Sequence, residues 1–289
     1  NEFQDDLKKQ TKAGMVMLLD YYQKLKKEEQ FDTDTLSGTI ALTNDSVTVA
    51  TTATEAIVVY GEGTETAPRY RLWDGSDWSS EGNMQDIAAP VRWILAEESP
   101  TREEYISVAL GTDADVNAQI YRDGTWSNLQ EMTTNIGGSS ARGIAVAYET
   151  LSGDALIAYC DNAADPSYRI WGAASSSWSN EATINVAETA NCDWIQLASD
   201  PVSDEIIVLV RGTDGSPYEA QVWDGDVWGD ATTLGNISED AHEGMALAYE
   251  ESGDQALIVT SDGAPARFEW DSWDGAAWNT WAATDEVLT

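Results

Sequence analysis

The chain has 289 residues, of which 51 are Asp or Glu and 15 are Lys or Arg, so its formal net charge is −36. This charge, without any cluster of basic residues, excludes binding to nucleic acid or to an anionic membrane surface. One histidine and two cysteines exclude a zinc cluster, and no apolar run approaches the roughly 18 residues of a membrane-spanning helix.

The charge is unevenly distributed along the chain. All six lysines lie between Lys8 and Lys27, where six acids within residues 1–30 balance them, so the remaining part carries 45 acids, nine arginines and no lysine. The break predicts two modules, residues 1–36 and residues 37–289. The acidic module is interpreted as a solvated surface suited to an extracellular or high-salt setting. The alternative is attraction of cations such as calcium, and no other cofactor is predicted.

Residues 4–29 contain no Pro and are rich in good helix formers. Apolar residues recur at intervals of mostly three or four, which predicts one amphipathic α-helix: Phe3, Leu7, Met15, Leu18, Tyr22 and Leu25. An amphipathic helix before a β domain resembles the polar second half of the long helix in type IV pilin-like subunits. The resemblance implies assembly with other copies of the chain. The alternative is a helix that packs back on the β domain.

The rest of the chain repeats with a period of about fifty residues. The repeated element resembles Trp-Asp-Gly-x-x-Trp, and its leading aromatic residues are spaced 48, 50, 52 and 50 apart: Trp73, Tyr121, Trp171, Trp223 and Trp273. A second series keeps the same interval: Trp93, Gly143, Trp194 and Gly244. Such a fixed period indicates a repeat architecture.

Each repeat contains four short predicted strands separated by turn residues, for example 91–96, 105–110, 117–122 and 126–131. Five such units predict an all-β fold, a five-bladed β-propeller with four antiparallel strands per blade, preceded by one α-helix. A row of separate small sandwiches is the alternative, but each unit would be too small to bury its own core. The surplus strand Thr39–Thr43 is expected to pair near residues 278–286 and close the ring.

The repeated turn also has a recognisable chemistry. Asp-Gly suits a tight hairpin turn, and the flanking aromatic rings can cover the gap between blades. The segment Arg122-Asp123-Gly124-Thr125-Trp126 resembles a shortened Asp-box, the turn between the third and fourth strands of sialidase-type propellers. The resemblance implies a structural role on the face away from any active site.

Candidate binding residues are expected on the opposite face. Trp93 and Trp194 begin two inner strands, and acidic loops accompany them: Asp113, Asp115, Asp161 and Asp214. Aromatic platforms beside carboxylates are typical of sugar-binding sites. The alternative is that these tryptophans fill gaps between blades and these aspartates form turns.

The sequence predicts a non-catalytic protein. The nine arginines are scattered, so no sialidase-like cluster is formed, and no carboxylate pair stands out for glycoside hydrolysis, which remains a distant alternative. The chain is therefore interpreted as an extracellular or cell-surface structural or adhesive subunit, with its propeller displayed on a helix used for assembly or anchoring. The alternative is a lectin-like propeller. Its partners are then copies of itself, or a surface glycan or protein.

Two further features fit an extracellular setting. Cys160 and Cys192 are placed to meet across adjacent blades, where they can form a disulfide in an oxidising compartment. Asn44 and Asn236 begin glycosylation sequons.

Overall fold

The computed structural model describes residues 46–52, 54–136, 141–186, 191–213, 217–236, 243–263 and 266–280. The chain divides into two compact units, residues 1–38 and 39–289, and all described residues belong to the second. The predicted N-terminal helix, its pilin-like resemblance and the closing strand Thr39–Thr43 lie outside the described residues. No helix in the described part of the chain is long and apolar enough to cross a membrane.

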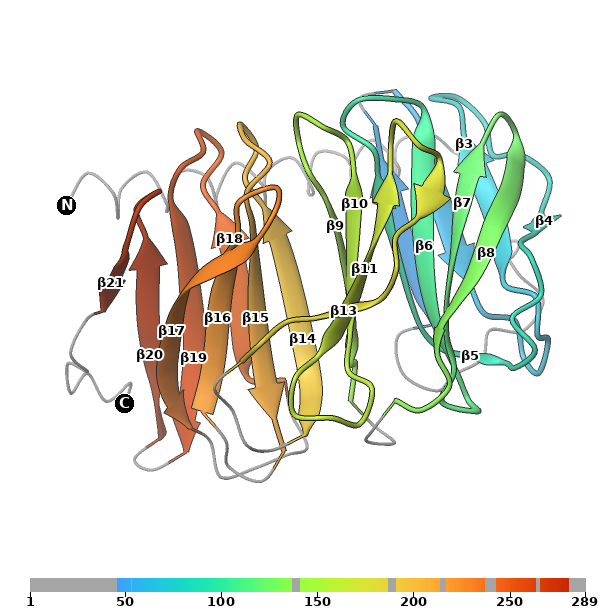
Figure 1. The fold of residues 1–289 in the computed structure, drawn as a ribbon. Coiled ribbons are helices and arrows are strands. Elements are labelled where there is room, and N and C mark those ends of the chain that lie inside the picture. Colours follow the sequence, from blue (N-terminus) through green and yellow to red (C-terminus); the bar gives the residue numbers. More distant parts are fainter. Residues whose placement is uncertain are drawn as a thin grey trace. The chain divides into compact units, whose positions relative to one another are not determined.

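The described residues form five antiparallel sheets, one per sequence repeat, as Figure 1 shows in the order of the chain. The first contains β1 Val47–Thr51, β2 Ala56–Tyr60, β3 Arg69–Trp73 and β4 Gly82–Asn83. The second contains β5 Val91–Glu98, β6 Glu104–Gly111, β7 Val116–Arg122 and β8 Thr125–Thr133. The third contains β9 Ile144–Tyr148, β10 Ala155–Tyr159 and β11 Ser167–Gly172, with β12 Ser177–Trp178 and β13 Ala182–Thr183 both pairing with β11.

The fourth sheet contains β14 Cys192–Ser199, β15 Ile206–Gly212, β16 Pro217–Trp223 and β17 Trp228–Asn236. The fifth contains β18 Met245–Tyr249, β19 Ala256–Gly263, β20 Ala266–Trp273 and β21 Trp278–Thr280. Successive sheets contact each other through their first strands: β1 with β5, β5 with β9, β9 with β14, and β14 with β18. The first strands are therefore the inner ones, as expected for the blades of a propeller. The prediction of four strands per sheet is confirmed for four sheets, and in the third two short strands, β12 and β13, pair with β11.

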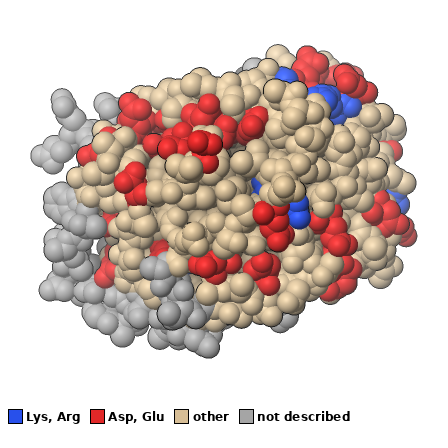
Figure 2. Space-filling view, in the orientation of Figure 1, with Lys and Arg blue, Asp and Glu red and all other residues tan. Residues whose placement is uncertain are grey.

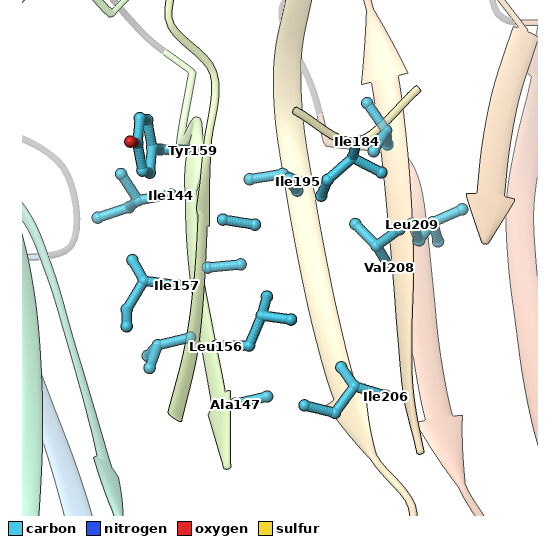
Figure 3. Packing of buried hydrophobic residues seen from close by; sticks show 14 of the residues in the cluster. Ile144, Ala147, Leu156, Ile157, Tyr159, Ile184, Ile195, Ile206, Val208 and Leu209 are labelled. Carbon is cyan, nitrogen blue, oxygen red and sulfur yellow. The ribbon is translucent and has the colours of Figure 1, made fainter. Parts of the chain in front are cut away.

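Burial explains which strands are apolar along their whole length. β2, β9 and β10 are buried at every residue, because sheets or strands pack against both of their faces. The buried side chains form two separate clusters, one between the first and second sheets and one running through the second to fifth sheets. Figure 3 shows part of the larger cluster, with Leu156, Ile195 and Val208 among the labelled residues.

The first four sheets alternate between two types. The second and fourth contain a register shift just before Trp93 and Trp194 and two further shifts between their third and fourth strands. The first and third share a hydrogen bond from the last residue of their second strand, Tyr60 or Tyr159, to a glutamate, 2.6 Å long in each case. Over these four sheets the pattern repeats every two sheets, about a hundred residues.

The leading tryptophans of the repeated turn join the third, fourth and fifth sheets each to the sheet before it. The indole N–H of Trp171 donates to Glu104 of the second sheet at 3.1 Å. Trp223 donates to Glu149 at 2.7 Å, and Trp273 to Glu205 at 2.6 Å. In each turn the two aromatic rings lie 5.1–5.4 Å apart with interplanar angles of 53–56°. The repeated motif is therefore an inter-sheet fastening.

The turn itself is held by its aspartate. In the fourth sheet, Asp224 Oδ1 accepts hydrogen bonds from the backbone N–H groups of Asp226 and Val227 at 2.9 and 2.8 Å. Gly225 has a φ of 97°, which favours glycine. Asp74 and Asp274 make the same pair of bonds, which lower the pKa of both carboxyls.

Candidate functional site

The two tryptophans predicted as sugar platforms lie on the inner strands. Trp93 and Trp194 are 9% and 6% exposed, and their rings meet edge-on with centroids 6.3 Å apart. They come from the second and fourth sheets, so the contact passes over the third. Arg142 and Glu243 make a similar connection from the third sheet to the fifth, at 2.5 Å. In this structure the two rings pack on each other and offer no open face for stacking.

Two of the predicted aspartates accept hydrogen bonds from nearby residues, although the second oxygen of Asp161, Oδ1, is buried without a partner among the described residues. Asp113 accepts a hydrogen bond from the backbone N–H of Asp115 at 3.2 Å, and Asp161 accepts one from Ser167 at 2.8 Å. Asp214 lies outside the described residues. No group of three or more potential ligand side chains suited to a metal ion occurs among the described residues.

The remaining predicted positions are placed as follows. Cys160, directly after β10, forms a disulfide with Cys192 at the start of β14, with Cα atoms 5.2 Å apart. The bond joins the third sheet to the fourth. Asn236 ends β17, and Asn44 lies outside the described residues.

A pocket of about 390 Å³ lies between the third and fourth sheets, near their outer strands. Its third-sheet wall includes Tyr168, Thr183 and Asn185, and its fourth-sheet wall includes Gln221 and Trp228. The Tyr168 and Trp228 rings meet edge-on at 5.8 Å. The volume falls within the range of small-molecule sites. An aromatic surface beside side-chain amides can stack a sugar ring and hydrogen-bond its hydroxyls.

The pocket is negatively charged. Its lining contains Asp226 and Asp230 and no lysine or arginine. Burial, with a further contribution from the charge of Asp226, raises the pKa of Tyr168. Both aspartates have fixed backbones, because Asp226 N–H donates to Asp224 and the Asp230 carbonyl accepts the indole N–H of Trp278 at 2.5 Å. Figure 2 shows one face of the molecule, on which acidic side chains are many and basic side chains few.

The equivalent place between the first and second sheets has a different lining. There Tyr70 packs against Tyr121 and Trp126 with centroids 5.5 and 5.8 Å apart, as Tyr168 does against Trp223 and Trp228. Three residues after its second aromatic, the second sheet has Leu129 where the fourth has Ala231. Nothing lies within 4 Å of a Cβ built on Gly229. Small residues therefore leave space in the fourth sheet.

None of the residues predicted from the sequence to bind a ligand lines this pocket, although the sequence holds a signal for it. Tyr70 and Tyr168 stand three residues before the first tryptophan of the repeated turn, where the second and fourth sheets have Ala118 and Ala220. A tyrosine at this position in one sheet packs against the two aromatic rings of the next sheet's turn. The alternation of tyrosine and alanine therefore marks the pairs of sheets between which three aromatic rings meet.

A second pocket, of about 320 Å³, lies at the C-terminal ends of the inner strands β5, β9 and β14, away from Trp93 and Trp194 at their beginnings. It is lined by Glu97 and Glu98 together with apolar residues of β9 and β14, such as Val146 and Leu197. Glu97 is exposed to the pocket, yet protein surrounds it on most sides. Loss of hydration, with the neighbouring charge of Glu98, raises the pKa of Glu97 to about 7.

Comparison with known proteins places the fold. No protein-family model matches the chain, and no curated protein matches its sequence. Among solved structures, the BP39L lectin from Burkholderia pseudomallei aligns with a TM-score of 0.55 at 13% identity, over 80% of this chain and 68% of that one. The six-bladed, fucose-recognising lectin of Aleuria aurantia gives 0.48 at 14% identity, over 82% of this chain and 78% of that one.

The β-propeller domain of the Trilobed protease from Pyrococcus furiosus also gives 0.48, at 10% identity, over 81% of this chain and 70% of that one. At these identities the likeness concerns the fold alone. The described residues have a β-propeller-like fold of five antiparallel sheets, four with four strands and the third with five.

Proposed function

We propose that the chain is a non-catalytic, carbohydrate-binding propeller that takes a sugar in the pocket between the third and fourth sheets. The pocket's composition carries the proposal. Tyr168 and Trp228 supply aromatic surface, and the side chains of Gln221 and Asn185 supply amide groups, although Gln221 Nε2 already donates to the Asn185 backbone carbonyl. The likeness to the BP39L lectin supports it at the level of the fold. Of the two interpretations of the sequence, the lectin-like alternative is thus better supported than the adhesive subunit.

Two finer features belong to the same proposal. The five sheets are blades of one ring, and whatever closes the ring is expected to cover the exposed flanks of the first and last sheets, where Val49 and Phe268 are 52% and 59% exposed. The protein acts outside the cell. The inter-sheet disulfide supports this location, because such bonds persist in oxidising compartments.

The test is glycan binding by a variant in which the pocket is filled. Ala231→Leu introduces the residue that the second sheet carries at the equivalent position and removes no existing contact. Glycan-array screening followed by calorimetry should find a ligand for the wild-type chain and a loss of at least about tenfold in affinity for this variant.

Leu129→Ala, the reverse change in the second sheet, is the matched control and should leave binding unchanged. Circular dichroism establishes that each variant is folded. The proposal fails if the wild-type chain binds no glycan, or if folded Ala231→Leu binds as tightly as the wild type. Release of sugar from a bound glycan would instead overturn the non-catalytic part.

A further inference from the structure

The charge of the pocket constrains the sugar that it can accept. Two aspartates line a space of about 390 Å³, and none of the ten lining residues is basic. A sugar carboxylate placed there would lose its hydration without gaining a cationic partner, and it would be repelled by both aspartates. Uronic and sialic acids are therefore disfavoured.

The two aspartates are also available to a ligand. Asp226 stands at the tip of the fourth sheet's turn, where its backbone N–H is bonded and its side chain is exposed. Asp230 has a φ of 44°, and its carbonyl group is fixed by Trp278 of the fifth sheet, so that its backbone is held in place while its side chain remains exposed. Carboxylates at fixed positions beside an aromatic face can receive an ammonium group together with an apolar ring face.

Further polar groups are present in the same pocket. The side chain of Trp228 hydrogen-bonds to that of Tyr168, which links the two walls of the pocket. Gln221 Nε2 donates to the backbone carbonyl of Asn185, and the amide oxygen of Gln221 is an acceptor for a ligand hydroxyl. The pocket thus offers carboxylate and amide acceptors beside an aromatic surface.

On this basis, and resting on the proposed function, we propose that the ligand of this pocket is a glycan bearing a free amino sugar, whose ammonium group binds Asp226 and Asp230. The sugar ring stacks on Trp228 and Tyr168, and the amides of Gln221 and Asn185 receive its hydroxyls. An N-acetylated sugar of the same shape has no ammonium group and should bind less tightly.

Three probes test the proposal: glucosamine, N-acetylglucosamine and glucuronic acid, each measured by calorimetry on the full chain at pH 6. Glucosamine should bind about tenfold more tightly than N-acetylglucosamine, the effect of one hydrogen bond to a charged group. Glucuronic acid should bind most weakly. Asp226→Asn should cost glucosamine about tenfold and change binding of N-acetylglucosamine by less than about twofold. Raising the salt concentration should weaken only glucosamine binding.

The matched control is Asp77→Asn, which removes the same charge from the corresponding turn of the first sheet and should leave all three affinities unchanged. If N-acetylglucosamine binds as tightly as glucosamine, or if Asp226→Asn weakens both equally, the amino-sugar proposal is overturned and the carbohydrate-binding function stands. If no glycan binds to the wild-type chain, the proposed function fails, and the present inference fails with it.

Discussion

The indole-to-glutamate bonds between sheets give a prediction that can be worked from the structure. Trp171 is fully buried, and its N–H donates to Glu104, which is 1% exposed and also accepts from Arg102, Arg122 and Tyr148. Trp171→Phe removes this donor. A hydrogen bond to a charged group contributes about 1.5–3 kcal/mol, and the lost half of the indole leaves a cavity that costs about 1 kcal/mol more.

The expected loss of stability is therefore about 3 kcal/mol, which for a domain of this size lowers Tm by roughly 6–12 °C. Thermal unfolding followed by near-ultraviolet circular dichroism measures it. The chain offers a matched control, because Tyr121 occupies the equivalent position of the second sheet and has no indole N–H. Tyr121→Phe should cost less than about 1 kcal/mol.

A double-mutant cycle isolates the bond itself. Combining Trp171→Phe with Glu104→Gln should give a coupling energy of at least about 1 kcal/mol, because the two groups are direct partners. If the single variant lowers Tm no more than Tyr121→Phe does, or if the two changes are additive, the tryptophans of the repeated turn do not fasten the sheets in the way described.

Three other changes test other parts of the structure. Trp93→Ala should destabilise the fold by about 3–5 kcal/mol because it leaves a cavity on the inner strands. Glycan affinity should be unchanged. Weaker glycan binding by the folded variant would instead show that the glycan site includes Trp93. Replacing Cys160 and Cys192 by Ser should cost about 3–4 kcal/mol, since the bond closes a loop with a sequence separation of 32, and should abolish any effect of reductant on Tm. Glu97 has a folded-state pKa above its unfolded value, so its contribution favours the folded state at pH 5 and is lost as pH rises towards 7. Glu97→Gln should accordingly raise the free energy of unfolding at pH 8 by about 1 kcal/mol and change it little at pH 5. The expected gain is smaller than the whole pKa shift would give, because the side chain is open to solvent. An equal effect at both pH values would contradict the raised pKa.

The fold could be predicted from the sequence because large aromatic residues recur at its period of about fifty residues. Tryptophans at nearly fixed intervals and Asp-Gly turns between alternating segments placed the strands of the second sheet within one or two residues. Trp93 and Trp194 were correctly assigned to inner strands. Their exposure was not predictable, because it depends on how far an inner strand bends at a β-bulge, and a bulge of one residue has no distinctive local sequence.

The pocket was harder to foresee for a different reason. The pocket shows in the sequence only as a difference between equivalent positions, Ala231 in the fourth sheet and Leu129 in the second. These positions are two repeats of fifty residues apart, so the difference does not appear between neighbouring repeats. A pocket created by a missing side chain has no motif of its own. It becomes visible only when Tyr168 and Trp228 are known to lie on facing walls.

The separation of the apolar core into two clusters affects how the protein unfolds. The second sheet contributes one face to each cluster: Ile94 and Ala109 pack towards the first sheet, and Ile106 and Val108 pack towards the third. Repeat proteins in which each unit contacts only its neighbours lose units from their ends. Here the contacts that pass over a sheet, Trp93 with Trp194 and Arg142 with Glu243, make the second to fifth sheets one cooperative unit. The first sheet, which packs on its own cluster, should therefore exchange its amide hydrogens earlier than the others.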